Sequence, residues 1–153
     1  MKTLTAETLS YIAGIFDGEG YVGIIRHQSE NDFWPCFMPR FVVAMTDKES
    51  IDWLKQETGI GAVSRVEAKG NRKDSYHWRL RICEMREFVP LLVPYLKLKR
   101  RRAELLLEFL KTCKGRRGGW VRLSESEYEL RESIYEELSK LNHRGRPYDL
   151  SRL

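Results

Sequence analysis

The segment YIAGIFDGEGYVGII at residues 11–25 constrains the fold more than any other part of the chain, because its glycines separate a helical pattern from a strand-like one. Gly18, Gly20 and Gly23 have the G-x-G-x-x-G spacing of a dinucleotide-binding turn. Such a turn follows a strand and opens a helix. Here the order is reversed, since apolar residues recur at helical spacing before the glycines and residues 21–25 have the composition of a strand. The glycines are therefore predicted to end a helix.

The end of this helix favours a cation over a phosphate. A helix C-terminus carries partial negative charge, and Asp17 and Glu19 add two carboxylates there. A phosphate would be repelled unless a metal ion lay between. The pattern predicts a cation site, and the alternative is that both carboxylates are solvated turn residues.

The distribution of charge points to a polyanionic partner. The chain has 153 residues and a net charge of +5. Residues 124–141 carry six acidic side chains against two basic ones, a net charge of −4, so the remainder carries +9. A concentrated positive field of this kind favours nucleic acid ahead of an anionic membrane.

Several functional classes are excluded by what the sequence lacks. It has no apolar run of membrane-spanning length and no signal peptide, so an intracellular protein without a membrane partner is expected. Its three cysteines show no C-x-x-C spacing and its three histidines form no H-E-x-x-H pair. We expect buried thiols, no disulfide framework and no zinc enzyme.

Hydrophobic periodicity predicts a single α+β domain over residues 1–153, with a core at about 5–113, an acidic helix at 124–141 and a tail at 142–153. Its elements follow the order αββαββα. We expect a four-stranded antiparallel sheet, shaped as a saddle, with the helices on one face. After the first helix, the expected strands are 21–28, 39–46, 62–69 and 75–82, and the expected helices are 47–57, 85–95, 98–113 and 124–141.

The other sheet face is predicted to be open and cationic. Strand alternation places Arg40, Arg79 and Arg81 on it, with His27 and Arg65 beside them. Such a face can be ordinary soluble surface. Because several strands agree, we expect it to enter the major groove of DNA, where arginine binds guanine through two hydrogen bonds.

The sequence IAGIFDGEG at residues 12–20 resembles the LAGLIDADG motif of homing endonucleases, and a single copy in so short a chain resembles the homodimeric members. The resemblance extends over about residues 8–112 and includes PYLKLK at 94–99, which is similar to a proline-led basic segment of those members. It implies the saddle fold, a homodimer and cleavage of double-stranded DNA at a long, near-palindromic site. It implies no small-molecule cofactor.

The resemblance also implies how two copies meet. The two motif helices would pack side by side, with Gly14 and Gly18 allowing close approach and with Ile15 and Asp17 at the same interface. Two copies of Glu19 would then lie near each other and need cations. Mg²⁺, for which Mn²⁺ can substitute, suits such an oxygen-rich site.

The catalytic residues implied by the resemblance are Glu19, Lys99 and Asp47, and the metal ligands are Glu19 with the carbonyl of Gly18. Lys99 would act electrostatically or polarise the attacking water; the alternative is a surface lysine at a helix start. The family usually has Asp where this chain has Glu19. Asp47 stands where relatives often carry Gln, and Ile51 where they carry Arg. Asp47 is expected either to order water or to cap the helix that follows it.

Basic and polar residues on the strands and loops are expected to contact DNA: Arg26, His27, Gln28, Arg40, Arg65, Lys69, Arg72, His77, Arg79, Arg81, Arg116 and Arg117. Two alternatives to an endonuclease remain: an RNA maturase that assists intron splicing, and a non-catalytic nucleic-acid-binding module.

Overall fold

The computed structural model describes residues 2–28, 35–68, 70–71, 73–113 and 123–142. It has the predicted α+β class and the order αββαββα, followed by a further helix. The elements are α1 (Ala6–Glu19), β1 (Gly20–His27), β2 (Cys36–Met45), α2 (Lys48–Thr58), β3 (Ala62–Val66), β4 (Ser75–Arg79), α3 (Ile82–Leu92), the 3₁₀ turn η1 (Val93–Tyr95), α4 (Arg100–Thr112) and α5 (Glu125–Asn142).

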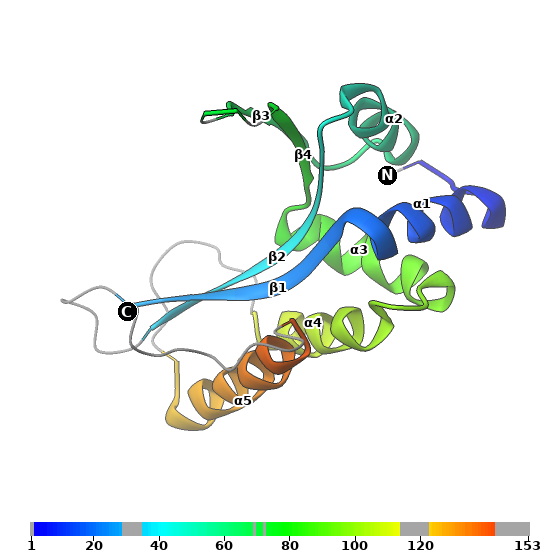
Figure 1. Ribbon diagram of the computed structural model, residues 1–153. Coiled ribbons are helices and arrows are strands. Elements are labelled where there is room, and N and C mark those ends of the chain that lie inside the picture. Colours follow the sequence, from blue (N-terminus) through cyan, green and yellow to red (C-terminus); the bar gives the residue numbers. More distant parts are fainter. Residues whose placement is uncertain (1, 29–34, 69, 72, 114–122, 143–153) are drawn as a thin grey trace.

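The four strands form one antiparallel sheet in the order β1-β2-β4-β3. Strand β2 is central, and its Val43 pairs with Gly20 of β1 and with Trp78 of β4. Figure 1 shows that the sheet curves and that the helices lie on its convex side. The predicted layer arrangement is confirmed, and no described element covers the concave side.

The covered face of the sheet packs into one hydrophobic core. Phe41, Val43 and Trp78 point into it and are fully buried. The ring of Phe16 from α1 stacks on Phe41 with centroids 3.9 Å apart, and Phe88 from α3 meets Phe41 edge-on. This packing fixes α1 against β2, and with it the end of the helix that carries the glycine-rich motif.

The junction between α1 and β1 has no loop. Helix α1 ends at Glu19, β1 begins at Gly20, and the Gly20 N–H donates to the carbonyl of Phe16. A Cβ at Gly20 would lie 2.5 Å from both the ring and the carbonyl of Phe16, so only glycine fits. The prediction that the glycines end a helix is confirmed, and Glu19 is held at the point where helix becomes strand.

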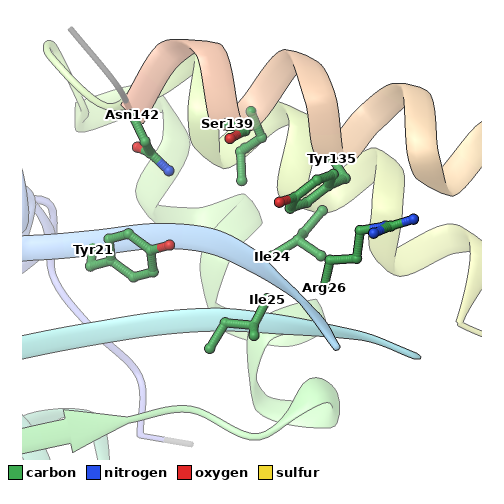
Figure 2. Close-up of a pocket in the computed structure, with 8 residues that line it drawn as sticks. Tyr21, Ile24, Ile25, Arg26, Tyr135, Ser139 and Asn142 are labelled. Carbon is green, nitrogen blue, oxygen red and sulfur yellow. The ribbon is translucent and has the colours of Figure 1, made fainter. Parts of the chain in front are cut away.

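Helix α5 packs along β1 and α4. Its Ile134 and Leu138 are buried in the common core, and Asn142 donates to the carbonyl of Val22 at 2.9 Å. Figure 2 shows α5 running beside β1, with a hollow of about 330 Å³ between them. A capping box starts α5, because the N–H of Ser124 donates to Glu127 and the N–H of Glu127 donates to the Ser124 hydroxyl.

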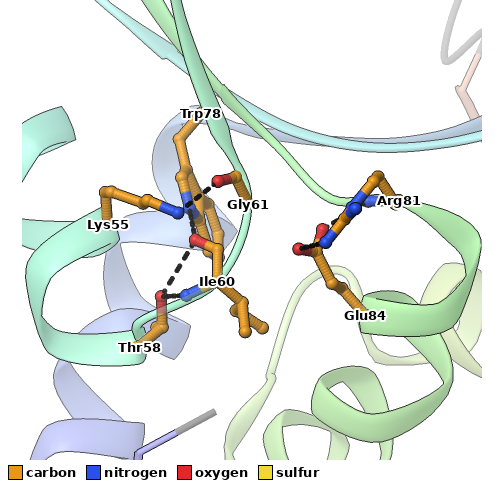
Figure 3. Close-up of polar contacts among 7 residues, drawn as sticks. All are labelled: Lys55, Thr58, Ile60, Gly61, Trp78, Arg81 and Glu84. Atoms are coloured by element: carbon orange, nitrogen blue, oxygen red, sulfur yellow. Dashed lines mark hydrogen bonds and ion pairs between the residues drawn. The ribbon is translucent and has the colours of Figure 1, made fainter.

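Polar contacts fix the β3–β4 hairpin to the helical layer (Figure 3). The indole N–H of Trp78 donates to the carbonyl of Ile60 at 2.9 Å, and Lys55 of α2 donates to the carbonyl of Gly61. Gly61 has φ of +83°, a conformation that favours glycine. The start of β3 is therefore tied to both α2 and β4.

Three expectations about local structure are wrong. Strand β4 ends at Arg79 rather than at residue 82, because the N–H of Arg81 donates to Glu84 and starts α3. Strand β3 ends at Val66 rather than at residue 69. Cys36 and Cys83 are exposed rather than buried. In the described ranges, no helix is long and apolar enough to cross a membrane.

Candidate active site at the end of the first helix

The motif helix ends beside a small hollow on the open side of the sheet. Glu19 is exposed, and its carboxylate accepts no hydrogen bond from any described residue. The hollow has a volume of about 260 Å³. Its lining comes from the α1 end, the β2–α2 connection and the start of β4: Glu19, Ala44, Met45, Thr46, Asp47 and Ser75.

Asp47 lies on the wall of this hollow and caps α2. Its carboxylate accepts the Ser50 N–H at 2.9 Å, and the hydrogen bonds from Ser50 lower the pKa of Asp47 below its ordinary value. The capping alternative is therefore confirmed. Asp47 and Glu19 line the same hollow, which is compatible with a water-ordering role for Asp47. That role stays a prediction. Ile51, one turn into α2, is fully buried in the core.

Lys99 lies against the C-terminus of α1. Its ammonium donates to the carbonyls of Phe16 at 2.9 Å, Asp17 at 2.7 Å and Gly18 at 3.4 Å. Partial burial lowers the pKa of Lys99, and the nearby Asp17 carboxylate opposes that effect. Lys99 is at a helix start, as the alternative has it, since it is the N-cap residue of α4, but its ammonium lies against the negative end of the α1 dipole. Its catalytic role stays a prediction.

Asp17 is engaged within its own chain. Its carboxylate accepts backbone N–H groups of Lys97 at 2.7 Å, Leu98 at 3.1 Å and Lys99 at 2.9 Å. Asp17 is therefore not the solvated turn residue of the alternative interpretation. Its side chain points toward the Lys97–Lys99 backbone, and nothing in the structure assigns it to an interface.

The donor set for a divalent cation is incomplete in one chain. Glu19 supplies an unpartnered carboxylate, and the Gly18 carbonyl lies next to it along the chain at the same helix end. These are oxygen donors of the kind that Mg²⁺ prefers. The described ranges contain no group of three or more His, Cys, Asp or Glu side chains that could hold a metal ion. The residues fit a divalent cation as one half of a site that further ligands must complete.

The expected interface on α1 includes an open strip. Gly14 and Gly18 are exposed, and a Cβ built on either would meet nothing within 4 Å. Ile15 is half-buried and packs against the core. The strip is compatible with a second helix at close range, and the dimer itself stays a prediction.

The open sheet face carries cations in register across the strands. Arg40 pairs with Gly23, Val42 with Arg79, and Ala44 with His77. His27 lies at the far end of the same face, opposite Cys36. The Nε of Arg40 is buried and has no hydrogen-bond partner in the part of the chain that the structure describes, whereas Arg79 donates to Ser64 at 2.8 Å.

Three residues expected to contact DNA lie elsewhere. Arg65 lies opposite Tyr76 in the β3–β4 register, and because side chains alternate along β3 it is on the covered face of the sheet. Its guanidinium donates to Asp74. Arg81 lies beyond β4 and contacts Glu84. Arg26 points to the helical side and contacts Glu132 of α5 at 3.2 Å.

The remaining members of the expected DNA surface are less informative. Gln28 follows β1 and is exposed. Lys69, Arg72, Arg116 and Arg117 lie outside the described residues.

Two residues of the open side were missed from the sequence. Tyr21 is 46% exposed there and lies over Gly23; burial raises the pKa of Tyr21, and the charge of Arg40 opposes the rise. Ser75 lines the hollow and contacts the ring of His77 at 3.1 Å. Strand alternation could have identified both residues. Tyr21 alternates onto the same face as His27 along β1, and Ser75 onto the same face as His77 and Arg79 along β4.

No protein-family model and no curated protein matches the sequence. Solved structures do match its fold. The DNA complex of the archaeal intron-encoded homing endonuclease I-Vdi141I is 19% identical with a TM-score of 0.74, over 94% of this chain and 89% of that one. The homing endonuclease I-CvuI, in complex with a DNA target, is 16% identical with a TM-score of 0.64, over 91% of this chain and 85% of that one.

The LAGLIDADG homing endonuclease I-LtrWI, bound to target DNA, is 14% identical with a TM-score of 0.67. Here the match covers 90% of this chain but 46% of that one. The three matches cover 90% to 94% of this chain. The chain therefore has the fold of the LAGLIDADG homing endonucleases.

Proposed function

We propose that the chain is a site-specific endonuclease that cuts double-stranded DNA as a homodimer with Mg²⁺, for which Mn²⁺ can substitute. The observation that carries this proposal is Glu19 at the end of α1, an exposed carboxylate that accepts no hydrogen bond from a described residue. It lies beside Lys99 and in one hollow with Asp47. An unpaired acid next to a cationic side chain and an open basic face suits metal-assisted phosphodiester hydrolysis.

The homodimer is supported by three observations. Gly14 and Gly18 leave open space on α1. Among the described residues of one chain, Glu19 is the unpartnered carboxylate at the helix end, and a second copy would add its own Glu19. The chain matches 89% of I-Vdi141I but 46% of I-LtrWI, and a chain of the second length has room for two such folds.

DNA is the substrate that the open sheet face fits best. Arg40, His77 and Arg79 lie on it without a carboxylate partner among the described residues, and the similar structures include homing endonucleases solved with DNA. The Nε of Arg40 has no hydrogen-bond partner among the described residues, and Arg40 lies on the face that would contact DNA. In the major groove, an arginine guanidinium binds a guanine edge or a phosphate.

We assign each residue near the α1 end a separate role in phosphodiester hydrolysis. Glu19 and the Gly18 carbonyl would hold the metal, which when bound supplies Lewis acidity and a lower pKa for the attacking water. The ammonium of Lys99 would stabilise negative charge that develops on the scissile phosphate. Asp47 would accept a hydrogen bond from the attacking water.

Selection of cut sites from a randomised duplex library, with Mg²⁺ present, tests the proposal. A symmetric consensus of two inverted half-sites is expected, because each subunit would contact one half. Failure of the wild-type protein to cut any duplex would overturn it. Binding to structured RNA without affinity for duplex DNA would instead support the maturase alternative.

A further inference from the structure

The C-terminus of α1 and the segment before α4 hold each other through reciprocal contacts. Asp17 accepts three consecutive backbone N–H groups, those of Lys97, Leu98 and Lys99. In return, the ammonium of Lys99 donates to the carbonyls of Phe16 and Asp17. The two segments are separated by about 80 residues along the chain, so these contacts are tertiary.

Among the described residues, Asp17 supplies the side chain that accepts these three N–H groups. The N-cap residue of α4 is Lys99, and its own side chain makes no capping hydrogen bond. Leu98, in the middle of the segment, is 69% exposed and contributes little packing to hold it. The carboxylate of Asp17 also lies near the positive end of the α4 dipole, where an anion is favoured.

We propose that Asp17 is the positioning residue for Lys99. By holding the backbone N–H of Lys99, it sets where that side chain starts and so where its ammonium meets the helix end beside Glu19. This inference rests on the proposed endonuclease function, in which Lys99 faces the scissile phosphate.

The two carboxylates of the motif therefore have separate tasks. Asp17 uses both oxygens on three N–H donors of its own chain, whereas Glu19 accepts no hydrogen bond from a described residue. Glu19 alone is free to bind a cation. Asp17 acts on the reaction only through the placement of Lys99.

Amide hydrogen exchange tests the placement without metal, DNA or catalysis. Asp17→Asn keeps one acceptor oxygen and replaces the other by a donor, so it cannot accept on both sides. Either the Lys97 and Leu98 amides, which share one oxygen, or the Lys99 amide, which uses the other, should exchange at least about tenfold faster than in the wild type. Amides in the middle of α4 should be unchanged. Equal protection of residues 97–99 in both proteins would overturn the proposal.

Cleavage by single and double variants tests the action through Lys99. Asp17→Asn should lower the single-turnover cleavage rate by about 10- to 100-fold, the cost of misplacing a catalytic group by about 1 Å, and should change the DNA dissociation constant by less than about threefold. The double variant with Lys99→Ala should cut no more slowly than Lys99→Ala alone. Additive losses would show that Asp17 acts independently of Lys99 and would overturn the proposal.

A matched control separates positioning from a general loss of capping. Glu127 also accepts a backbone N–H at the start of a helix, but it lies in α5, remote from the α1 end. Glu127→Gln should leave the cleavage rate unchanged. An equal loss of rate in Glu127→Gln and Asp17→Asn would overturn the specific role.

A second variant covers the case in which Asp17→Asn does not fold. Asp17→Glu keeps the charge and moves the carboxylate by one methylene, and it should also reduce the cleavage rate with DNA binding retained. A wild-type rate in Asp17→Glu would overturn the proposal. A wild-type protein that cuts no duplex would overturn the endonuclease function instead, and the exchange measurement would still decide whether Asp17 holds the segment.

Discussion

The two faces of the sheet carry similar charged side chains that are satisfied in different ways. On the covered side, Arg26 is paired with Glu132, Arg65 with Asp74 and, just beyond β4, Arg81 with Glu84. On the open side, Arg40 and Arg79 have no carboxylate partner among the described residues. The paired groups are bound to carboxylates of the same chain, whereas Arg40 and Arg79 are available to an anionic partner.

The same contrast holds among the acidic side chains. Glu84 is buried and bonded to Arg81, while Glu19 is exposed and unbonded. If ion pairs between side chains mark structural charges, substitutions on the two sides should separate stability from activity. Asp17 falls outside this rule, because backbone N–H groups rather than a cationic side chain hold it.

The largest effect is expected at Glu19. Glu19→Gln removes the charge that would hold the metal and keeps the shape of the side chain. Cleavage should fall by about 10³-fold or more, the order expected when a central electrostatic group is lost. Thermal unfolding and DNA binding should stay near wild type, because this exposed carboxylate accepts no hydrogen bond from a described residue. A loss of binding as large as the loss of cleavage would contradict the assignment.

A smaller effect is expected on assembly from Gly14→Leu. The new side chain enters open space on the single chain, so the fold should persist. It would separate two helices that must touch, and the dimer should weaken at least about tenfold, equivalent to about 1.4 kcal/mol. Analytical ultracentrifugation measures this effect, and an unchanged dimer would exclude α1 as the interface.

If the open face contacts bases, a substitution on it should change which bases the protein prefers in its DNA site. Arg79→Ala should cost about 1 to 3 kcal/mol on the preferred site and relax one position in each half-site. The control is Arg65→Ala, which removes the same side chain from the opposite face of the neighbouring strand. Binding profiles over a duplex library compare them, and a relaxed preference in Arg65→Ala alone would mean that the faces were assigned the wrong way round.

The smallest effect, about 1 to 2 kcal/mol of stability, is expected on the paired side from Glu84→Gln. The hydrogen bond from Arg81 lowers the pKa of Glu84 from 4.5 to about 2. Because the folded pKa is depressed, the stabilisation is present above about pH 4.5 and is lost as the pH falls toward 2.

Urea unfolding across this pH range should therefore show a steeper acid destabilisation in the wild type than in Glu84→Gln. The cleavage rate at neutral pH should be the same in both proteins. A variant with wild-type stability and impaired cleavage would break the rule that paired charges are structural.

Much of this arrangement was predictable from local patterns. Alternation in β2 identified Phe41 and Val43 as core and Arg40 as open, and the reversed order around Gly20 identified a helix end rather than a phosphate loop. These features depend on neighbours in sequence, which periodicity reports directly.

What the sequence did not predict depends on contacts between distant segments. The three N–H groups that bind Asp17 lie about 80 residues away, and the partner of Arg26 lies on α5, more than 100 residues away. The alternating pattern wrongly predicted that β4 continues through Arg81. Helix α3 starts early because the carboxylate of Glu84 accepts the N–H of Arg81, and alternation does not report that contact. No spacing rule specifies such partners.

The position of α5 has a consequence for how the protein behaves at high concentration. Strand β1 is an edge of the sheet and has eight residues, long enough to recruit a strand from another molecule. Helix α5 runs beside it, and Asn142 occupies the carbonyl of Val22. The opposite edge, β3, has only five residues. A chain lacking α5 would keep the motif helix and the basic face, but it would expose its long edge and become prone to aggregation.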